Sequence, residues 1–233
     1  MIKKIEAKKM GKSDLGWLKS HFHFSFAEYY NPKNTCFGVL RVLNDDVVNP
    51  QTGFDMHPHK DMEIISYVVE GRLTHVDSMG NKSHLNRGEV QYISAGTGVF
   101  HSEHNLGQEM ARLLQIWIIP DKKNHQPNYG EHRFEWDLRK NTWLHLVSSY
   151  SRTAPIKVHQ DVNIYALELE EECVHSFNVL NGRQAYLVQI QGESLINKMR
   201  LEMRDALEIQ EELISIEAIV TSHFLLIEMA KDD

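Results

Sequence analysis

The chain has 233 residues, of which 42% are hydrophobic and 24% charged, as in an ordinary globular protein. Its formal net charge of −7 argues against direct nucleic-acid binding, which requires clustered basic side chains. The amino terminus lacks the apolar stretch of a signal peptide, and no segment reaches the ~20 apolar residues that span a bilayer. Two cysteines, Cys36 and Cys173, favour free thiols over a disulfide. We expect a cytoplasmic protein that binds neither nucleic acid nor membranes.

Short β-forming segments follow one another along the first half of the chain. They lie at 21–26, 38–43, 64–70, 72–76, 89–93 and 113–119. A Gly–Asn pair within residues 77–82 is typical of a hairpin turn. No helical pattern is long enough to form a crossover layer. Short strands with turn signals about every ten residues predict an all-β sandwich or barrel.

The second half begins after a polar segment. Residues 121–137 are rich in turn formers, which predicts a connector, and strand signals return at 164–169. A weak internal repeat, in which residues 67–73 resemble residues 187–193, indicates two related halves. We therefore expect an amino-terminal domain over residues 1–130 and a carboxy-terminal domain over residues 131–233.

Two pairs of side chains carry the chemistry. His57 and His59 are two residues apart, which places both imidazoles on one face of an extended segment. His101 and Glu103 repeat this spacing with an imidazole and a carboxylate. Either pair alone is more often a packing feature, but two pairs on neighbouring strands can converge on one ion. Three imidazoles and a carboxylate suit a divalent transition metal and leave open positions on an octahedral ion.

The residues around both pairs resemble the two cupin motifs. Residues 57–71 read HPHKDME…YVVEG, and residues 88–105 read GEVQYISAGTG…HSEHN. The HPH followed by a glutamate, the D-S-x-G-N turn and the SAGTG…HSE ending are similar to the pirin family. Residues 17–30 and 158–161 resemble two further blocks of that family. The resemblance covers most of the chain and is closest to bacterial pirin-like proteins of the quercetinase type.

This resemblance implies a bicupin, with two antiparallel β-barrel or jelly-roll (cupin) domains in one chain. The first domain would hold one metal through His57, His59, His101 and Glu103, and the second would be a degenerate cupin without metal. General cupins take their carboxylate from the first motif, where Glu63 is the candidate. We favour Glu103, because one residue fewer than usual separates His59 from Glu63. We expect iron, with nickel, copper, manganese, cobalt and zinc as alternatives.

The activity implied by the resemblance is that of a quercetin 2,3-dioxygenase, an oxidoreductase whose substrates are a flavonol-like small molecule and O2. The flavonol is cleaved to a depside and carbon monoxide, and Glu103 would accept the proton of the 3-hydroxyl group. The alternative is a non-catalytic, metal-dependent regulatory pirin that binds a protein partner. An open pocket favours the enzyme, and a closed, ligand-saturated metal site favours the regulator. A cupin isomerase or another oxygenase is a third hypothesis.

Other histidines have simpler interpretations. His21 and His23 alternate with phenylalanines, as in a half-buried strand. His104 is a candidate to orient a metal ligand. His175 and His223 lie where ligands of the second half would fall, but neither has an HxH partner, so we expect no second metal site. Four apolar residues are candidates to line the mouth of the site, namely Phe54, Met56, Phe100 and Trp117. Core packing is the default interpretation for each of them.

Overall fold

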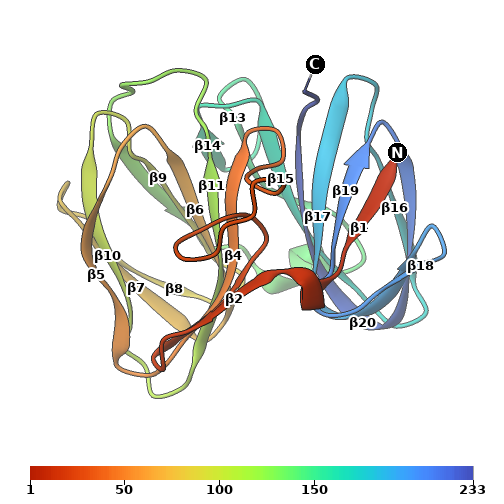
Figure 1. Cartoon of the computed structure of the whole chain (residues 1–233), viewed down its shortest axis with the longest axis horizontal. Helices are drawn as coiled ribbons and strands as arrows, with labels where there is room; N and C mark the ends of the chain where they lie inside the picture. Colours follow the sequence, from red (N-terminus) through yellow and green to blue (C-terminus); the bar gives the residue numbers. More distant parts are fainter. Residues whose placement is uncertain (233) are drawn as a thin grey trace. The chain divides into compact units, whose positions relative to one another are not determined.

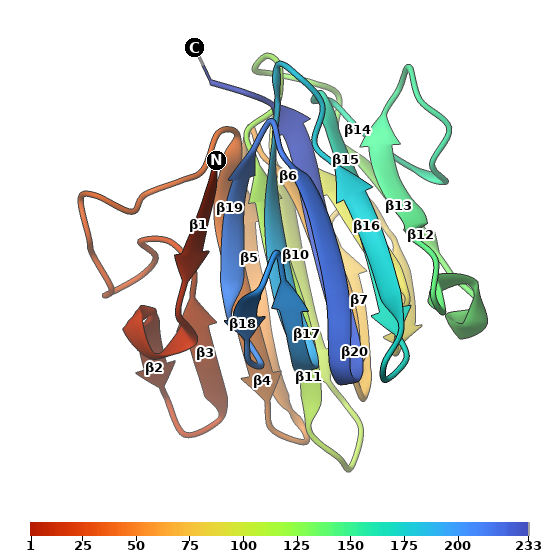
Figure 2. The same ribbon diagram turned by 90° about the vertical axis from the view of Figure 1, so that its right-hand side faces the viewer.

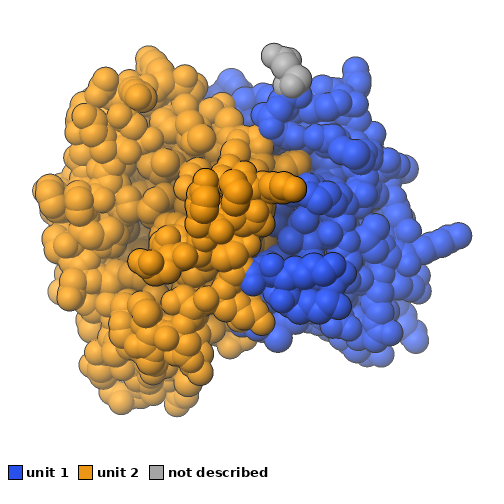
Figure 3. Space-filling model, in the orientation of Figure 1, with its two compact units in different colours: residues 1–10, 135–157, 161–233 blue, residues 11–134, 158–160 orange. Residues whose placement is uncertain are grey.

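A computed structural model describes residues 1–232 of the chain. Strands account for 60% of it and helix for 3%, which confirms the predicted all-β class. The chain divides into two compact units, which Figure 3 shows in different colours. The amino-terminal unit comprises residues 11–134 and 158–160, and the carboxy-terminal unit comprises residues 1–10, 135–157 and 161–233.

The amino-terminal unit contains two antiparallel sheets (Figure 1). The larger sheet has the order β12-β9-β6-β11-β4-β3-β2, with β2 (Gly11–Asp14), β3 (Leu18–Phe22), β4 (Leu40–Val48), β6 (Glu63–Glu70), β9 (Val90–Ser94), β11 (Ala111–Ile118) and β12 (Asn128–His132). The smaller has the order β5-β10-β7-β8, with β5 (Thr52–His59), β7 (Arg72–Asp77), β8 (Lys82–Asn86) and β10 (Val99–Asn105). Buried leucines and valines of both sheets form one cluster, which includes Val68 of β6 and Leu73 of β7. The two sheets therefore enclose a shared apolar core.

The carboxy-terminal unit is built on a nine-stranded sheet (Figure 2). Its main order is β1-β19-β17-β20-β15-β13-β14, while β16 pairs with β20 and β18 with β17. The strands are β1 (Ile2–Ile5), β13 (Leu144–Ser149), β14 (Ile156–Val158), β15 (Val162–Leu169), β16 (Val174–Asn178), β17 (Arg183–Ile196), β18 (Met199–Leu201), β19 (Ala206–Gln210) and β20 (Leu213–Ala230). Two 3-10 turns, η1 (Ala7–Lys9) and η2 (Trp136–Arg139), complete it. Neither of these helical turns, which are all the helix that residues 1–232 contain, is long and apolar enough to span a bilayer.

The bicupin prediction is confirmed for the chain as a whole, but the sheets remain open. The described strands form no closed barrel in either unit. Long strands bend at irregularities instead, and β17 shifts register against β20 between Gln189 and Ser194. Gly71 and Gly192, the glycines of the repeat, both have left-handed backbones, with φ of +72° and +81°. Gly71 lies between β6 and β7, where the chain passes from the larger sheet to the smaller, whereas Gly192 lies within β17.

Two local predictions were wrong. The strand expected over residues 21–26 ends at Phe22, because the Ser25 hydroxyl donates to the carbonyls of Asn31 (2.8 Å) and Asn34 (3.0 Å) and stabilises a loop. The connector expected over residues 121–137 contains β12, which pairs with β9 through backbone hydrogen bonds, and the start of η2.

The expected turn over residues 77–82 is confirmed. It joins β7 to β8, and the Asp77 carboxylate accepts hydrogen bonds from the backbone N–H groups of Met79 (2.9 Å) and Asn81 (3.0 Å). A short aspartate side chain that binds the backbone ahead of it is a common means of fixing a turn.

Candidate metal centre and its cavity

Strand pairing brings the two predicted pairs of residues together. His101 of β10 lies directly opposite His57 of β5, and alternation along β5 places His59 on the same face as His57. The ring centroids are 4.4 Å apart for His57 and His101, 4.8 Å for His57 and His59, and 4.9 Å for His59 and His101. One nitrogen from each ring lies within 4.8 Å of the other two. The three imidazoles therefore form a group of the size that one ion requires.

The histidine nitrogens are available as metal ligands. Burial, followed by the neighbouring imidazoles, lowers the pKa of both His59 and His101 to about 3, so both rings are neutral at neutral pH. Neither ring nitrogen of the buried His101 has a hydrogen-bond partner among residues 1–232. Nδ1 of His57 donates to the carbonyl of Asp55 at 2.7 Å, which leaves Nε2 as the nitrogen available to a metal. Such a set of neutral nitrogen donors fits a divalent transition metal.

Glu103 is held by neutral donors of the larger sheet. Its carboxylate is 1% exposed and follows an irregularity in the pairing of β10 with β5. Oε1 accepts hydrogen bonds from Gln91 Nε2 (2.5 Å) and Ser66 Oγ (2.7 Å), and Oε2 accepts one from Gln115 Nε2 (2.7 Å). Glu103 falls in a second group of possible ligands with His101 and His75, rather than in the group of three imidazoles. The carboxylate thus lies beside the imidazoles, in an orientation fixed by three side chains.

Glu63, the alternative carboxylate, binds elsewhere. It is 1% exposed and accepts hydrogen bonds from Ser94 Oγ (2.6 Å) and the backbone N–H of His159 (3.1 Å). Neither group of possible metal ligands among residues 1–232 includes Glu63. Its contacts join β6 to β9 and to the segment 158–160 of the same unit, a structural role.

The remaining histidines lie outside the group of three imidazoles. His23 is fully buried, and burial lowers its pKa to about 3. His104 Nε2 lies 3.2 Å from Oδ1 of Asp55, the residue whose carbonyl accepts the hydrogen bond of His57, and an orienting role for His104 stays a prediction. His175 and His223 belong to no group of possible ligands among the described residues.

The sequence interpretation placed His75 close to the cupin motifs but gave it no role. This side chain is fully buried, lies 3.1 Å from Asp77 Oδ2 and stacks on Tyr129 with 4.7 Å between ring centroids. It falls in the second ligand group because β7 pairs with β10 and places His75 opposite Glu103. Its i, i+2 spacing from Asp77 is the only signal of this arrangement in the sequence.

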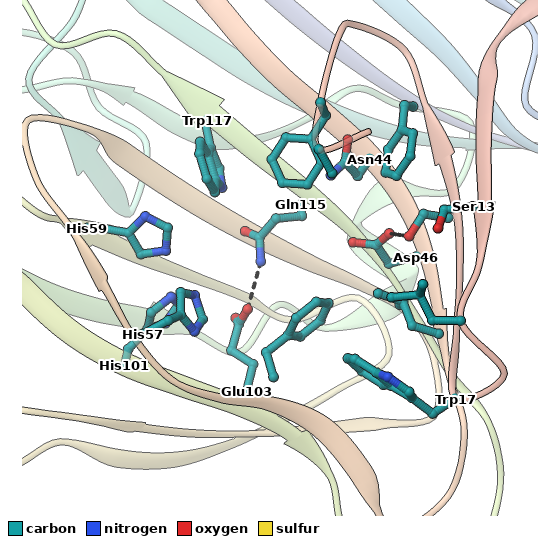
Figure 4. A pocket seen from close by; sticks show the side chains of 17 residues that line it. Ser13, Trp17, Asn44, Asp46, His57, His59, His101, Glu103, Gln115 and Trp117 are labelled. Carbon is teal, nitrogen blue, oxygen red and sulfur yellow. Dashed lines mark hydrogen bonds between the residues drawn. The ribbon is translucent and has the colours of Figure 1, made fainter. Parts of the chain in front are cut away.

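A cavity of about 350 Å³ opens beside the imidazoles (Figure 4). This volume lies within the range of ~300–1,000 Å³ that is typical of small-molecule sites. Of the four candidates for the mouth of the site, Phe54 and Trp117 line the cavity, whereas Met56 and Phe100 are exposed and do not. Trp117 contacts His59 edge-on with 4.8 Å between ring centroids. The lining is Ser13, Leu15, Trp17, Leu18, Ser20, Phe22, Phe26, Ala27, Asn44, Asp46, Phe54, His57, His59, His101, Glu103, Gln115 and Trp117.

Known proteins resemble both halves of the chain. The pirin family model matches residues 4–118, and the model described as the quercetinase C-terminal cupin domain matches residues 145–229. A quercetin 2,3-dioxygenase of Escherichia coli strain K12 is 42% identical over 233 residues, or 98% of this chain and 99% of that protein. A pirin-like protein of Caulobacter vibrioides is 39% identical over 232 residues, or 99% of this chain and all of that protein.

A solved structure resembles the whole fold. The crystal structure of the bacterial pirin YhhW from Escherichia coli in complex with nickel(II) matches with a TM-score of 0.93 and 38% identity, and the match covers 100% of both chains. The family expected from the two motifs is therefore confirmed: the chain belongs to the pirin family.

Proposed function

We propose that this pirin is a metal-dependent dioxygenase that cleaves quercetin-like flavonols with O2. The observation that carries the proposal is a group of three imidazoles, suited to bind one metal, in the wall of an aromatic-lined cavity of about 350 Å³. The name of the quercetin 2,3-dioxygenase from Escherichia coli supports the same reaction. The reaction consumes one O2 and one flavonol and yields one depside and one carbon monoxide.

We propose His57, His59, His101 and Glu103 as the ligands of one divalent metal. Iron remains the first candidate, and the nickel(II) complex of the Escherichia coli pirin makes nickel the next to test. The metal, when bound, would act as a Lewis acid that makes a phenolic hydroxyl group more acidic. All four residues line the same cavity, which supports their joint action on one ligand.

The protein's own residues supply the base and the environment. We assign Glu103 as the acceptor of the proton from the flavonol 3-hydroxyl, since Gln91, Ser66 and Gln115 fix its orientation. Aromatic side chains such as Phe54 and Trp117 offer flat surfaces to the substrate rings. A proton acceptor in a fixed position beside the metal ligands lowers the entropic cost of the first step.

The cavity favours the enzyme over the non-catalytic regulator. A regulatory metal centre needs no space for a small molecule beside its ligands. Here a cavity adjoins the imidazoles and includes Glu103 in its lining, as a substrate site requires (Figure 4).

Anaerobic metal loading followed by turnover assays would test the proposal. We expect one metal per chain by elemental analysis, and oxygen uptake with release of an equal amount of carbon monoxide on addition of quercetin. His101→Ala should lose both the metal and the turnover, whereas His175→Ala, outside either ligand group, should retain both. One metal per chain without turnover in the wild type would support the regulatory alternative, and the absence of bound metal would refute the proposed centre.

A further inference from the structure

A row of polar side chains crosses the larger sheet of the amino-terminal unit. Gln91 of β9 lies opposite Ser66 of β6, Ser66 opposite Gln115 of β11, and Gln115 opposite Asn44 of β4. Directly opposed residues of paired strands project to the same face of a sheet, so all four side chains share one face. The first three donate to Glu103, while Asn44, the fourth, lies further along the cavity wall. We call these four residues the polar row.

Asn44 has an unused hydrogen-bonding atom. The residue is 3% exposed, and its Oδ1 has no hydrogen-bond partner among residues 1–232. A buried polar atom left without a partner destabilises the folded chain. Because Asn44 lines the cavity, a ligand there can supply the missing partner.

A second polar pair lies beside Asn44. Asp46 is two residues further along β4, hence on the same face, and lies opposite Ser20 of β3. Ser20 Oγ donates to Asp46 Oδ1 at 2.5 Å, and both residues are buried in the cavity wall. Figure 4 shows Asp46 and Asn44 toward one side of the cavity and His57, His59 and His101 toward the other.

The chemistry of this wall suits an uncharged polar group. Burial raises the pKa of Asp46 to about 7, so the carboxyl group carries a proton in much of the population near neutral pH. Asn44 and Ser20 are neutral. A hydroxyl group both donates and accepts hydrogen bonds, so it can pair with an amide, a serine or a carboxyl group.

We infer that Asn44, with the Ser20–Asp46 pair beside it, forms a subsite for a phenolic hydroxyl at the end of the ligand remote from the metal-binding histidines. The inference rests on the proposed function, because it takes the cavity as the flavonol site. Aromatic side chains, among them Phe22 and Trp117, line the same cavity and favour a flat ring between its two polar ends. The ligand class is therefore a planar aromatic with hydroxyl groups at both ends.

Binding of two flavonols to the anaerobic, metal-loaded full chain tests the subsite. Quercetin carries hydroxyl groups on its outer rings, and 3-hydroxyflavone lacks them but keeps the 3-hydroxyl. Isothermal titration should give the wild type a preference of about 3- to 10-fold for quercetin, as expected of one neutral hydrogen bond. Asn44→Leu should abolish this preference and leave the affinity for 3-hydroxyflavone unchanged. Asn44→Thr, which retains a hydroxyl group, should keep part of the preference and serves if the leucine variant does not fold.

Asn163→Leu is the matched control, since it removes a buried asparagine of the carboxy-terminal unit that does not line the cavity, and it should keep the wild-type preference. An unchanged preference in Asn44→Leu would overturn the subsite. An equal loss of affinity for both flavonols would also overturn it, because it would show a structural role for Asn44. Failure of both flavonols to bind the metal-loaded wild type is a different result, which refutes the proposed function and the subsite with it.

Discussion

Gln115 of β11 and Glu103 of β10 meet across the interior of the amino-terminal unit, with 2.7 Å between Nε2 of the glutamine and Oε2 of the carboxylate. The two strands belong to different sheets, so this hydrogen bond joins the larger sheet to the strand that carries two of the proposed ligands. Gln115 belongs to neither group of possible ligands among residues 1–232. Its contribution to catalysis would therefore be the orientation of Glu103.

Replacement of this donor should separate orientation from metal binding. We expect Gln115→Leu to lower the rate of oxygen uptake with quercetin by about 10- to 100-fold, the usual effect of losing a residue that orients a ligand. The metal content should stay near one per chain, because the three imidazoles are unchanged. Gln189→Leu, which removes a buried glutamine of the other unit, is the control and should retain the wild-type rate. Equal rates in Gln115→Leu and the wild type would contradict an orienting role.

Gly53 should be indispensable to the metal centre. A Cβ atom at this position would lie 2.3 Å from the carbonyl oxygen of Glu103 and 2.5 Å from Cα of His104. Gly53→Ala should therefore push β5 away from β10, lower the free energy of unfolding by about 1–3 kcal/mol and reduce the metal content. Gly107→Ala is the control, because its Cβ would approach only the Asn105 side chain, at 3.1 Å, and the backbone N of Glu109, at 4.0 Å. Elemental analysis and urea unfolding of both variants provide the measurement, and full metal content in Gly53→Ala would refute the prediction.

Asp46 should make the stability of the metal-free protein depend on pH. Burial raises its pKa from 3.8 to about 7 in the folded chain, so the folded state binds more protons than the unfolded state between these values. The contribution of this group to stability is present at low pH and is lost as the pH rises toward 7. His23 acts in the opposite direction, because burial lowers its pKa from 6.5 to about 3.

Asp46→Asn isolates the carboxyl group from this opposing effect. Relative to the wild type, the variant should gain about 2–4 kcal/mol of stability as the pH rises from 4 to 8. Urea unfolding of the metal-free proteins at several pH values measures the difference. Glu28→Gln, which alters an exposed carboxylate, is the control and should follow the wild type. A constant difference between Asp46→Asn and the wild type across this range would refute the prediction.

The buried ion pair of Asp45 and Arg112 should contribute strongly to stability. The guanidinium of Arg112 donates from Nε to Oδ1 of Asp45 at 2.8 Å and from Nη2 to Oδ2 at 2.6 Å. The Arg112 side chain is 6% exposed and the Asp45 side chain 1% exposed. Arg112→Met leaves a buried carboxylate without this partner and should cost about 3–5 kcal/mol in urea unfolding. Lys19→Met, which breaks an exposed pair with Asp14, should cost at most about 1 kcal/mol. Similar losses in the two variants would contradict the importance of burial.

The clustering of the candidate metal ligands could be predicted from the sequence because its signal is local. An i, i+2 spacing in a strand places two side chains on one face whatever strand lies beside it. The pairs His57–His59 and His101–Glu103 therefore indicated a shared site before the pairing of β5 with β10 was known. The β-forming residues 64–70 and the turn at 77–82 are local signals in the same sense.

The rest of the cavity could not be predicted in this way. Asn44 and Gln115 are far apart in the sequence, and only the register of β4 against β11 places them opposite each other. The same holds for Ser20 and Asp46, which β3 and β4 bring together. The first ten residues likewise gave no sign that β1 would pair with β19, more than two hundred residues away. These relationships depend on long-range pairing, which composition and periodicity do not encode.

The hydrogen bonds that the polar row donates to Glu103 depend on the register of its paired strands. A slip of one residue between paired strands turns every side chain of the displaced strand to the opposite face. If β11 slipped against β6, an apolar neighbour, Leu114 or Ile116, would replace Gln115 opposite Ser66, while the content of β-structure stayed the same. Only those short insertions and deletions in the loops of this unit that preserve the alignment of β9, β6 and β11 would therefore keep the three donors of Glu103 in place. Circular dichroism cannot distinguish a correctly aligned larger sheet from a misaligned one, because both have the same content of β-structure. Turnover would distinguish them, because it requires the donors of Glu103.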